Sequence, residues 1–244
     1  MELDTSGNRH GNGGILLVDK PLGLTSADVV SRLRRKLPGV KVGHGGTLDP
    51  MATGLLIVML NGATKLSDKL MAGRKVYTGT IYFGFSTDGD DREGRPLSFG
   101  HCSAIGLEKI ERTLPQFVGQ FWQRPPALCA AKIGGVAAYK LVRRGKKVPE
   151  IRKLVDVHSI DSLGWSAPLL KIRISCSMGT YIRSIGRDIG EKLRCPAHLH
   201  ELRRMSSGNF SLQSARRLSL LEALPPEEIW THCIAVSDCG EMAI

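Results

Sequence analysis

Apolar residues along the chain gather in short continuous runs and in one alternating segment. The runs at 15–18 and 55–60 are bounded by glycine or turn residues, which predicts two buried strands. Residues 75–85 alternate between two sets of positions and predict a longer strand with one face on the core. Two further strands are expected near 155–163 and 169–176.

Other segments carry apolar residues at helical spacing, and helices are expected at 26–37, 63–71, 107–117 and 180–193. Thr180 is the expected N-terminal cap of the last one. Strands and helices mix without a regular strand–helix–strand rhythm. The pattern therefore predicts an α+β domain with a mixed, mostly antiparallel sheet flanked by helices.

The charge balance favours a polyanionic partner. Lys and Arg number 34 against 23 Asp and Glu, which gives a net charge of +11. Release of counterions from phosphates drives proteins of this kind onto nucleic acids, although a merely basic protein has the same balance. The charge is also clustered, at 32–36, 143–147, 203–204 and 216–217.

Membrane, secretory and metal-binding classes find little support in the sequence. The apolar run at 55–60 is far shorter than the roughly 20 residues of a spanning helix, and the polar start has no signal-peptide pattern. We expect a flexible leader at 1–13 and a cytoplasmic protein. The six cysteines form no C-x-x-C pair, and His232, Cys233 and Cys239 lack a suitably spaced fourth ligand. Neither a disulfide framework nor a metal is expected.

Residues 43–54 form the densest candidate for chemistry. Four glycines surround a single carboxylate, Asp49, which is followed by Pro50. Glycines allow close approach of a ligand to the backbone, and the proline restricts the conformation of Asp49. A catalytic carboxylate and a tight turn with a capping Asp are both open interpretations. A phosphate-binding P-loop is excluded, because no Gly-Lys-Ser/Thr occurs.

Two other segments carry candidate side chains. Arg183 is expected in the first turn of a helix, where a cation is unfavourable unless it answers an anion. That anion could be Asp49 or a phosphate, and a plain surface arginine is the alternative. Tyr77 lies on the inward side of the predicted strand at 75–85, either as a core residue or as a ring for stacking on an extruded base.

Taken together, these segments resemble the TruB family of tRNA pseudouridine-55 synthases. The resemblance runs from about Gly14 to Phe210. The matching positions are 17–21, 23, 25–26, 43–54, 63–65, 77, 87–88, 94, 125–126, 131–132, 139, 145, 179–183, 188–190 and 202–204. Three departures are Gly45 for the usual threonine, Leu128-Cys129 for a tyrosine-serine pair, and Met178 for a lysine.

The resemblance implies a pseudouridine-synthase fold with a central RNA-binding cleft. It implies an isomerase that flips uridine 55 out of the T arm of tRNA and converts it to pseudouridine without a cofactor. Asp49 would be the catalytic aspartate, Tyr77 the ring that stacks on the base, and Arg183 the ion-pair partner of Asp49. Residues implied to bind the substrate are His44, Lys20, Tyr181, Leu202, Lys132, Arg143 and Arg144.

The same resemblance implies a catalytic domain at 14–217, with an RNA-gripping insertion at 120–150. The segment 218–244 is expected to be a short tail with one short helix and no C-terminal PUA domain. We expect a monomer without an obligatory protein partner. Two rival functions remain. The first is a non-catalytic module on the same fold that binds and folds tRNA. The second is a base-releasing hydrolase, which would normally use two carboxylates.

Overall fold

The structure is a computed structural model, and it describes residues 13–127, 132–133, 136–137 and 152–236. The described chain forms two compact units. Unit 1 comprises the chain up to Gly73 together with the chain from Arg204 onward, and unit 2 comprises Arg74–Arg203. Residues 1–12 of the predicted leader, most of the predicted insertion, and Arg143 and Arg144 lie outside the described residues.

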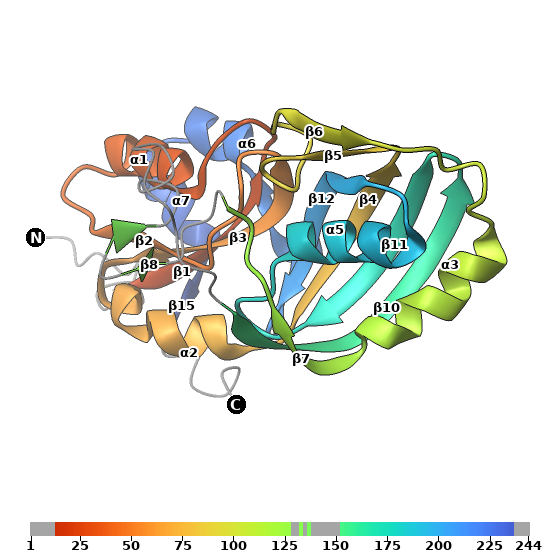
Figure 1. Cartoon of the computed structure of the whole chain (residues 1–244). Helices are drawn as coiled ribbons and strands as arrows, with labels where there is room; N and C mark the ends of the chain where they lie inside the picture. The colour runs from red at the N-terminus through yellow and green to blue at the C-terminus, as the bar shows by residue number, and fades with distance from the viewer. Residues whose placement is uncertain (1–12, 128–131, 134–135, 138–151, 237–244) are drawn as a thin grey trace, which may run out of the picture. The chain divides into compact units, whose positions relative to one another are not determined.

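Unit 1 is built on a small sheet (Figure 1). Its central strands are β1 (Gly14–Lys20) and β3 (Ala52–Leu60), which pair antiparallel over their length. The strand β2 (Val42–Gly45) pairs with β3, and β15 (Cys233–Ala235) and the parallel β14 (Arg216–Arg217) pair with β1. The runs at 15–18 and 55–60 are confirmed as buried strands.

Both faces of these central strands are covered, which explains why they appear as continuous apolar runs. On one face Leu16 and Val18 pack into a cluster that includes Leu33 of helix α1 (Ser26–Lys36). On the other face Ile15 and Leu17 join a second cluster. That face is covered by η1 (Asn61–Leu66) and α2 (Ser67–Ala72), which contribute Ala63 and Leu70 to the cluster.

The segment after residue 217 belongs to the core of unit 1. It contains α6 (Leu218–Ala223) and α7 (Pro226–Thr231) as well as β15. Leu218, Leu221 and Ile229 are buried in the same cluster as α1. Two short helices and a strand therefore stand where one short helix and little else were expected, because Leu218, Leu221 and Ile229 find partners in the core that the sparse apolar pattern does not reveal.

Unit 2 is built on strands that pair antiparallel. The strands β4 (Lys75–Phe83), β11 (Leu169–Cys176), β10 (Lys153–Ser166) and β7 (Gly119–Gln123) pair in that order. Helix α5 (Ile182–Leu193) lies across one face, together with α3 (Leu107–Thr113) (Figure 1). The described part of unit 2 also contains η2 (Leu114–Phe117) and the hairpins β5 (Phe85–Thr87) with β6 (Pro96–Phe99) and β8 (Lys132–Ile133) with β9 (Val136–Ala137).

Strand β12 (Ala197–Ser207) crosses the boundary between the units and was absent from the sequence prediction. Its first residues lie beside β4 in unit 2, and its end pairs with β13 (Phe210–Ser211) in unit 1, where η3 (Leu212–Ser214) follows. His198 and Arg204 point inward and are buried. Because these inward residues are polar, the alternation typical of a strand is hidden in the sequence.

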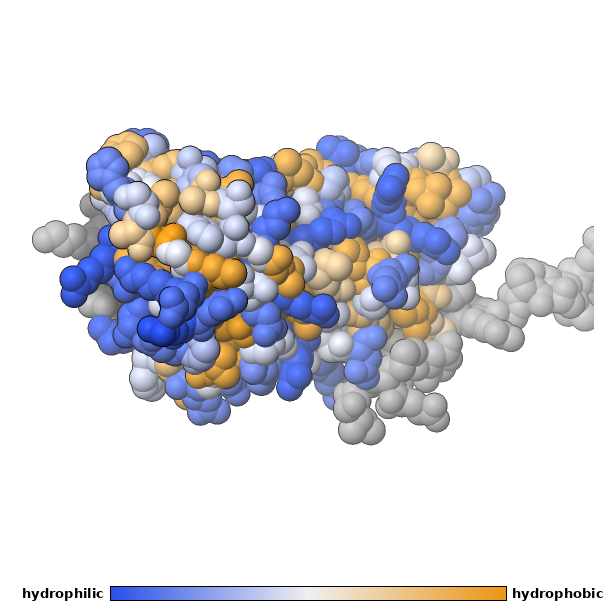
Figure 2. Space-filling view, turned by 90° about the vertical axis from the view of Figure 1, so that its right-hand side faces the viewer, coloured by the Kyte–Doolittle hydropathy of each residue, from blue (hydrophilic) through white to orange (hydrophobic). Residues whose placement is uncertain are grey.

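On the face shown in Figure 2, hydrophobic residues lie in patches separated by hydrophilic ones. Among the helices within the described ranges, none is long and apolar enough to cross a lipid bilayer.

Candidate active site

Asp49 lies in a short loop of unit 1 between two paired strands. The loop is shorter than the predicted range 43–54, because the first residues of that range belong to β2 and the last ones belong to β3. Asp49 itself is half-buried, whereas Leu48 and Met51 beside it are buried in the core. The carboxylate therefore stands on a loop that is anchored by apolar side chains on both sides.

Hydrogen bonds hold the backbone on either side of Asp49. The Leu48 amide donates to Ser26 Oγ at 2.9 Å, and that hydroxyl donates back to the Leu48 carbonyl at 3.2 Å. On the other side, the Gly23 amide donates to the Pro50 carbonyl at 2.9 Å. The Asp49 carbonyl accepts from the Ala52 amide at 3.0 Å. A carboxylate held this way is preorganised for chemistry.

Lys20 is fully buried at the end of β1. Its Nζ donates to the carbonyls of Pro21 at 2.9 Å, Leu24 at 2.5 Å and Pro50 at 3.5 Å. A buried ammonium group is costly unless its donors are satisfied, and here carbonyl oxygens surround it. Lys20 thus ties the turn after β1 to the loop that carries Asp49.

Arg204 of β12 binds the backbone on both sides of the same loop. This side chain is only 1% exposed. Its Nε donates to the Leu55 carbonyl at 2.7 Å, and its Nη2 donates to the Gly46 carbonyl at 3.1 Å. Gly46 has a φ of +78°, and a Cβ at this position would lie 3.2 Å from Arg204 Nη1. The guanidinium therefore joins the two ends of the loop. In the sequence, Arg204 stands out only as part of a basic cluster and of a matching motif.

His44 lies on β2, near Arg204. Burial lowers the pKa of its imidazole, and the positive charge of Arg204 lowers it further. His44 is therefore neutral at pH 7 and can act as a hydrogen-bonding group rather than as a cation.

We expect Arg204→Met to lower the free energy of unfolding by about 3 kcal/mol, because two backbone carbonyls lose a buried charged donor. Urea unfolding followed by circular dichroism measures the change. Arg35→Met, at an exposed position of α1, is the matched control and should shift stability by less than about 0.5 kcal/mol. Equal unfolding midpoints and slopes for the Arg204 variant and the wild type would contradict the role of Arg204 in holding the loop.

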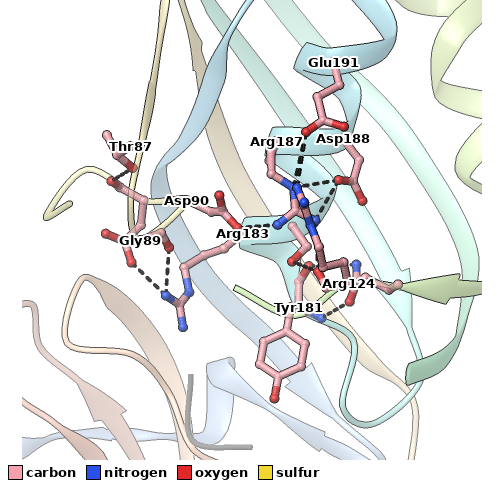
Figure 3. Close-up of polar contacts among 12 residues, drawn as sticks. Thr87, Gly89, Asp90, Arg124, Tyr181, Arg183, Arg187, Asp188 and Glu191 are labelled. Atoms are coloured by element: carbon pink, nitrogen blue, oxygen red, sulfur yellow. Dashed lines mark hydrogen bonds and ion pairs between the residues drawn. The ribbon is translucent and has the colours of Figure 1, made fainter. Parts of the chain in front are cut away.

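In unit 2, Arg183 is held by the loop that follows β5. Its Nη1 donates to the Gly89 carbonyl at 2.9 Å and lies 3.2 Å from Asp91 Oδ2 (Figure 3). Both side chains of this ion pair are about nine-tenths buried. The sequence pointed to Asp49 or a phosphate as the anion for Arg183 and missed Asp91, since Asp91 stands in an acidic, turn-rich stretch that was read only as a loop.

Asp91 is fixed by its own surroundings. Thr87 Oγ1 donates to the Asp91 carbonyl at 2.6 Å, and Asp91 Oδ1 accepts from the Glu93 amide at 3.0 Å. The Arg92 amide donates to the Leu199 carbonyl of β12 at 3.1 Å. The carboxylate that holds Arg183 is thus part of an ordered turn joined to the sheet.

The start of α5 differs from the prediction. The helix begins at Ile182 with Tyr181 as the N-cap residue and without a side-chain cap bond, so Thr180 is not the cap. Instead the Tyr181 amide donates to Gln123 Oε1 at 2.9 Å, and Gln123 Nε2 donates to the Tyr181 carbonyl at 3.1 Å. A glutamine from β7 therefore satisfies the backbone of Tyr181. Arg183 still falls in the first turn, as predicted.

Tyr77 and Leu202 are buried side chains of the same unit, each 7% exposed. Tyr77 lies on β4 opposite Ile174 of β11. Leu202 belongs to the part of β12 that borders β4, and a Cβ at Gly79 would lie 3.5 Å from its Cδ1. The strand prediction for Tyr77 is confirmed, and its ring faces the interior.

The predicted site residues divide between the two units. Asp49, Lys20 and His44 gather around one loop of unit 1, and Tyr77, Tyr181, Arg183 and Leu202 belong to unit 2. Lys132 is part of the short strand β8.

Comparison with known proteins places the chain in a family. Residues 34–182 match the N-terminal domain of the TruB family pseudouridylate synthases, and residues 183–231 match the C-terminal domain of tRNA pseudouridylate synthase B. The chain belongs to the TruB family of pseudouridylate synthases, which are isomerases. The resemblance stated from the sequence is confirmed.

Relatives with assigned names agree with this placement. The chain is 43% identical over 215 residues to tRNA pseudouridine synthase B of Solibacter usitatus, covering 88% of this chain and 73% of that protein. It is 42% identical over 223 residues to tRNA pseudouridine synthase B of Opitutus terrae, covering 91% of this chain and 92% of that protein.

Solved structures confirm the α+β pseudouridine-synthase fold. A Cbf5-Nop10-Gar1 complex has a chain that matches with a TM-score of 0.69 and 28% identity, over 91% of this chain and 63% of that one. An H/ACA RNP bound to a substrate RNA containing 2'-deoxyuridine matches with a TM-score of 0.65 and 27% identity, over 86% and 53%. The chain thus spans less than two thirds of these two structural relatives.

Proposed function

We propose that this protein converts uridine 55 in the T arm of tRNA to pseudouridine, with Asp49 as its catalytic carboxylate. The observation that carries the proposal is the fixed position of Asp49, whose flanking residues are bonded to Ser26, Gly23 and Lys20. The relatives named tRNA pseudouridine synthase B support tRNA as the substrate. The net charge of +11 suits an RNA partner.

The reaction moves a base without any net change in composition. The N1–C1′ glycosidic bond breaks, the uracil turns, and a C5–C1′ bond forms. C5 then loses its proton while N1 carries one, so atoms and electrons balance within the nucleotide. An ionised Asp49 can serve this sequence as a nucleophile or as a base. One carboxylate is sufficient, whereas glycoside hydrolysis normally uses two.

The other residues are assigned supporting roles in the proposal. Tyr77 stacks on the extruded base and is placed to help remove the C5 proton, while Arg183 supports the negative charge of Asp49. The proposal assigns RNA or substrate contacts to His44, Tyr181, Leu202, Lys132, Arg143 and Arg144. The sequence resemblance implied such a contact for Lys20 as well, but its side chain is buried among backbone carbonyls. Lys20 contributes by holding the Pro50 carbonyl, which follows Asp49 directly.

We further propose that the protein works in the cytoplasm, as a monomer and without an obligatory protein partner. Cbf5 in the solved complexes is accompanied by Nop10 or by Nop10 and Gar1. Among the residues that the structure describes, Ser26, Lys20 and Arg204 hold the loop that carries Asp49.

Mass-spectrometric mapping of pseudouridine in tRNA from cells that lack the gene tests the proposal. We expect the T-arm pseudouridine to disappear and to return when the wild-type gene is restored, but not when the Asp49→Asn variant is restored. T-arm pseudouridine that persists without the gene would reject the proposal. Pseudouridine restored equally by the wild-type gene and by the Asp49→Asn variant would favour a role in binding and folding tRNA.

A further inference from the structure

A second arginine of α5 has no part in the roles described above. Arg187 follows Arg183 by one helical turn, and both side chains reach toward the loop that contains Gly89 and Asp90 (Figure 3). Arg187 is 9% exposed, and its Nη1 lies 2.6 Å from Asp90 Oδ2. A buried ion pair thus stands beside the one that holds Arg183.

Asp90 occupies a special position in its loop. It lies between Gly89 and Asp91, which supply the carbonyl and the carboxylate that bind Arg183. Its φ is +58°, a left-handed conformation that is uncommon in residues other than glycine but is adopted by Asp in turns. The Asp90 carbonyl accepts from the Leu199 amide at 3.0 Å, and Arg187 holds its side chain.

Arg187 joins this loop to two other segments. Its Nη2 donates to the Arg124 carbonyl, just after β7, at 2.9 Å, and its Nε donates to Asp188 Oδ1 at 2.8 Å. Ser184 Oγ donates to the same Arg124 carbonyl at 2.8 Å. Three separate bonds in different directions need the planar fork of an arginine, which a lysine cannot reproduce.

The electrostatics agree with this geometry. Burial raises the pKa of the Asp90 carboxyl, and the positive charges of Arg187 and then Arg183 oppose that rise. Two arginines at positions i and i+4 of one helix therefore grip neighbouring residues of one loop. Without Arg187 the Asp90 side chain would lose its ion-pair partner, and the loop would be held by Arg183 and by the backbone bonds of Asp90 and Arg92 to Leu199.

We infer that Arg187 and Asp90 are positioning residues of the active site. They fix the loop at 88–91, and the loop in turn fixes Arg183. Neither residue is assigned a contact with RNA, and the inference rests on the proposed function. The inference predicts that substitution of either residue lowers kcat and leaves KM nearly unchanged, because a misplaced catalytic group slows the chemical step but does not weaken RNA binding.

The test measures kcat and KM on a T-arm RNA, and the melting temperature, for two variants. Arg187→Met should lower kcat about tenfold or more, with KM changed less than about threefold. It should also lower the melting temperature, because it leaves the Asp90 carboxylate buried without its partner. The double variant with Arg187→Met and Asp90→Asn removes both charges, so the melting temperature should recover while kcat stays low.

Arg112→Met is the matched control, since Arg112 is an exposed residue of α3, and it should keep the wild-type kcat. A double variant whose kcat recovers together with its melting temperature would show a merely structural ion pair and overturn the inference. An unchanged kcat in Arg187→Met would do the same. A wild-type protein that forms no pseudouridine would instead reject the proposed function, and the inference with it.

Discussion

Asp49→Asn is expected to lower the rate of pseudouridine formation by about 10⁴-fold or more, because the amide is neither a nucleophile nor a base. The substitution keeps the size and shape of the side chain. The backbone bonds of Leu48 and Pro50 do not involve the carboxylate, so the loop should keep its form. Binding of T-arm RNA, measured by filter retention or fluorescence anisotropy, should change less than about threefold.

Asp68→Asn provides the matched control for this experiment. Asp68 lies at an exposed position of α2 in the same unit, and the chemical change is the same. We expect wild-type activity from this variant. Full activity of Asp49→Asn would exclude the assigned role of Asp49, whereas loss of both binding and activity would point to a collapsed loop.

Arg183→Lys is expected to reduce kcat about 10²-fold, because an ammonium group does not reproduce the two-directional contacts of the guanidinium. Arg183 lies within hydrogen-bonding distance of both the Gly89 carbonyl and the Asp91 carboxylate. Single-turnover kinetics on T-arm RNA separates the chemical step from binding and product release.

Asp91→Asn should cause a loss of similar kind, since it weakens the hold on Arg183 without touching the arginine. Arg112→Lys, at an exposed salt bridge of α3, is the control and should behave as the wild type. Wild-type kinetics in the Asp91 variant, together with a slow Arg183 variant, would show that Asp91 does not position Arg183.

The sequence predicted well those elements in which apolar burial dominates. Both faces of β1 and β3 are buried, so each strand appears in the sequence as a continuous apolar run. The strand β11 lies at the predicted residues 169–176. The helix α1 was predicted from the spacing of its apolar residues, and the structure adds a capping box formed by Thr25 and Asp28.

Elements whose interior is polar escaped prediction. In β12 the buried Arg204 binds backbone carbonyls, and in β7 the buried Gln123 binds the backbone of Tyr181. A sequence pattern treats such residues as outward-facing, because their partners become known only in the fold. The prediction for β7 failed for a second reason, since its residues fell within the expected insertion at 120–150.

The candidate site was predictable in part for the same reason. The glycine-rich setting of Asp49 is a local signal, and Lys20 was identified through a matching motif. The partners of Arg183 and Arg187 are acidic residues about 90 positions earlier in the chain. The sequence does not indicate which arginine pairs with which of two consecutive aspartates in a turn. The ion-pair partners of Asp90 and Asp91 could therefore be assigned only from the structure.

The most direct test of the central claim uses purified protein and a T-arm RNA that carries tritium at C5 of uridine 55. We predict release of one tritium per RNA, with pseudouridine at that position and no free uracil. Pseudouridine formation must release the C5 hydrogen, whereas hydrolysis of the glycosidic bond would leave it on the base. Retained tritium with intact uridine, or free labelled uracil, would contradict the proposed isomerisation.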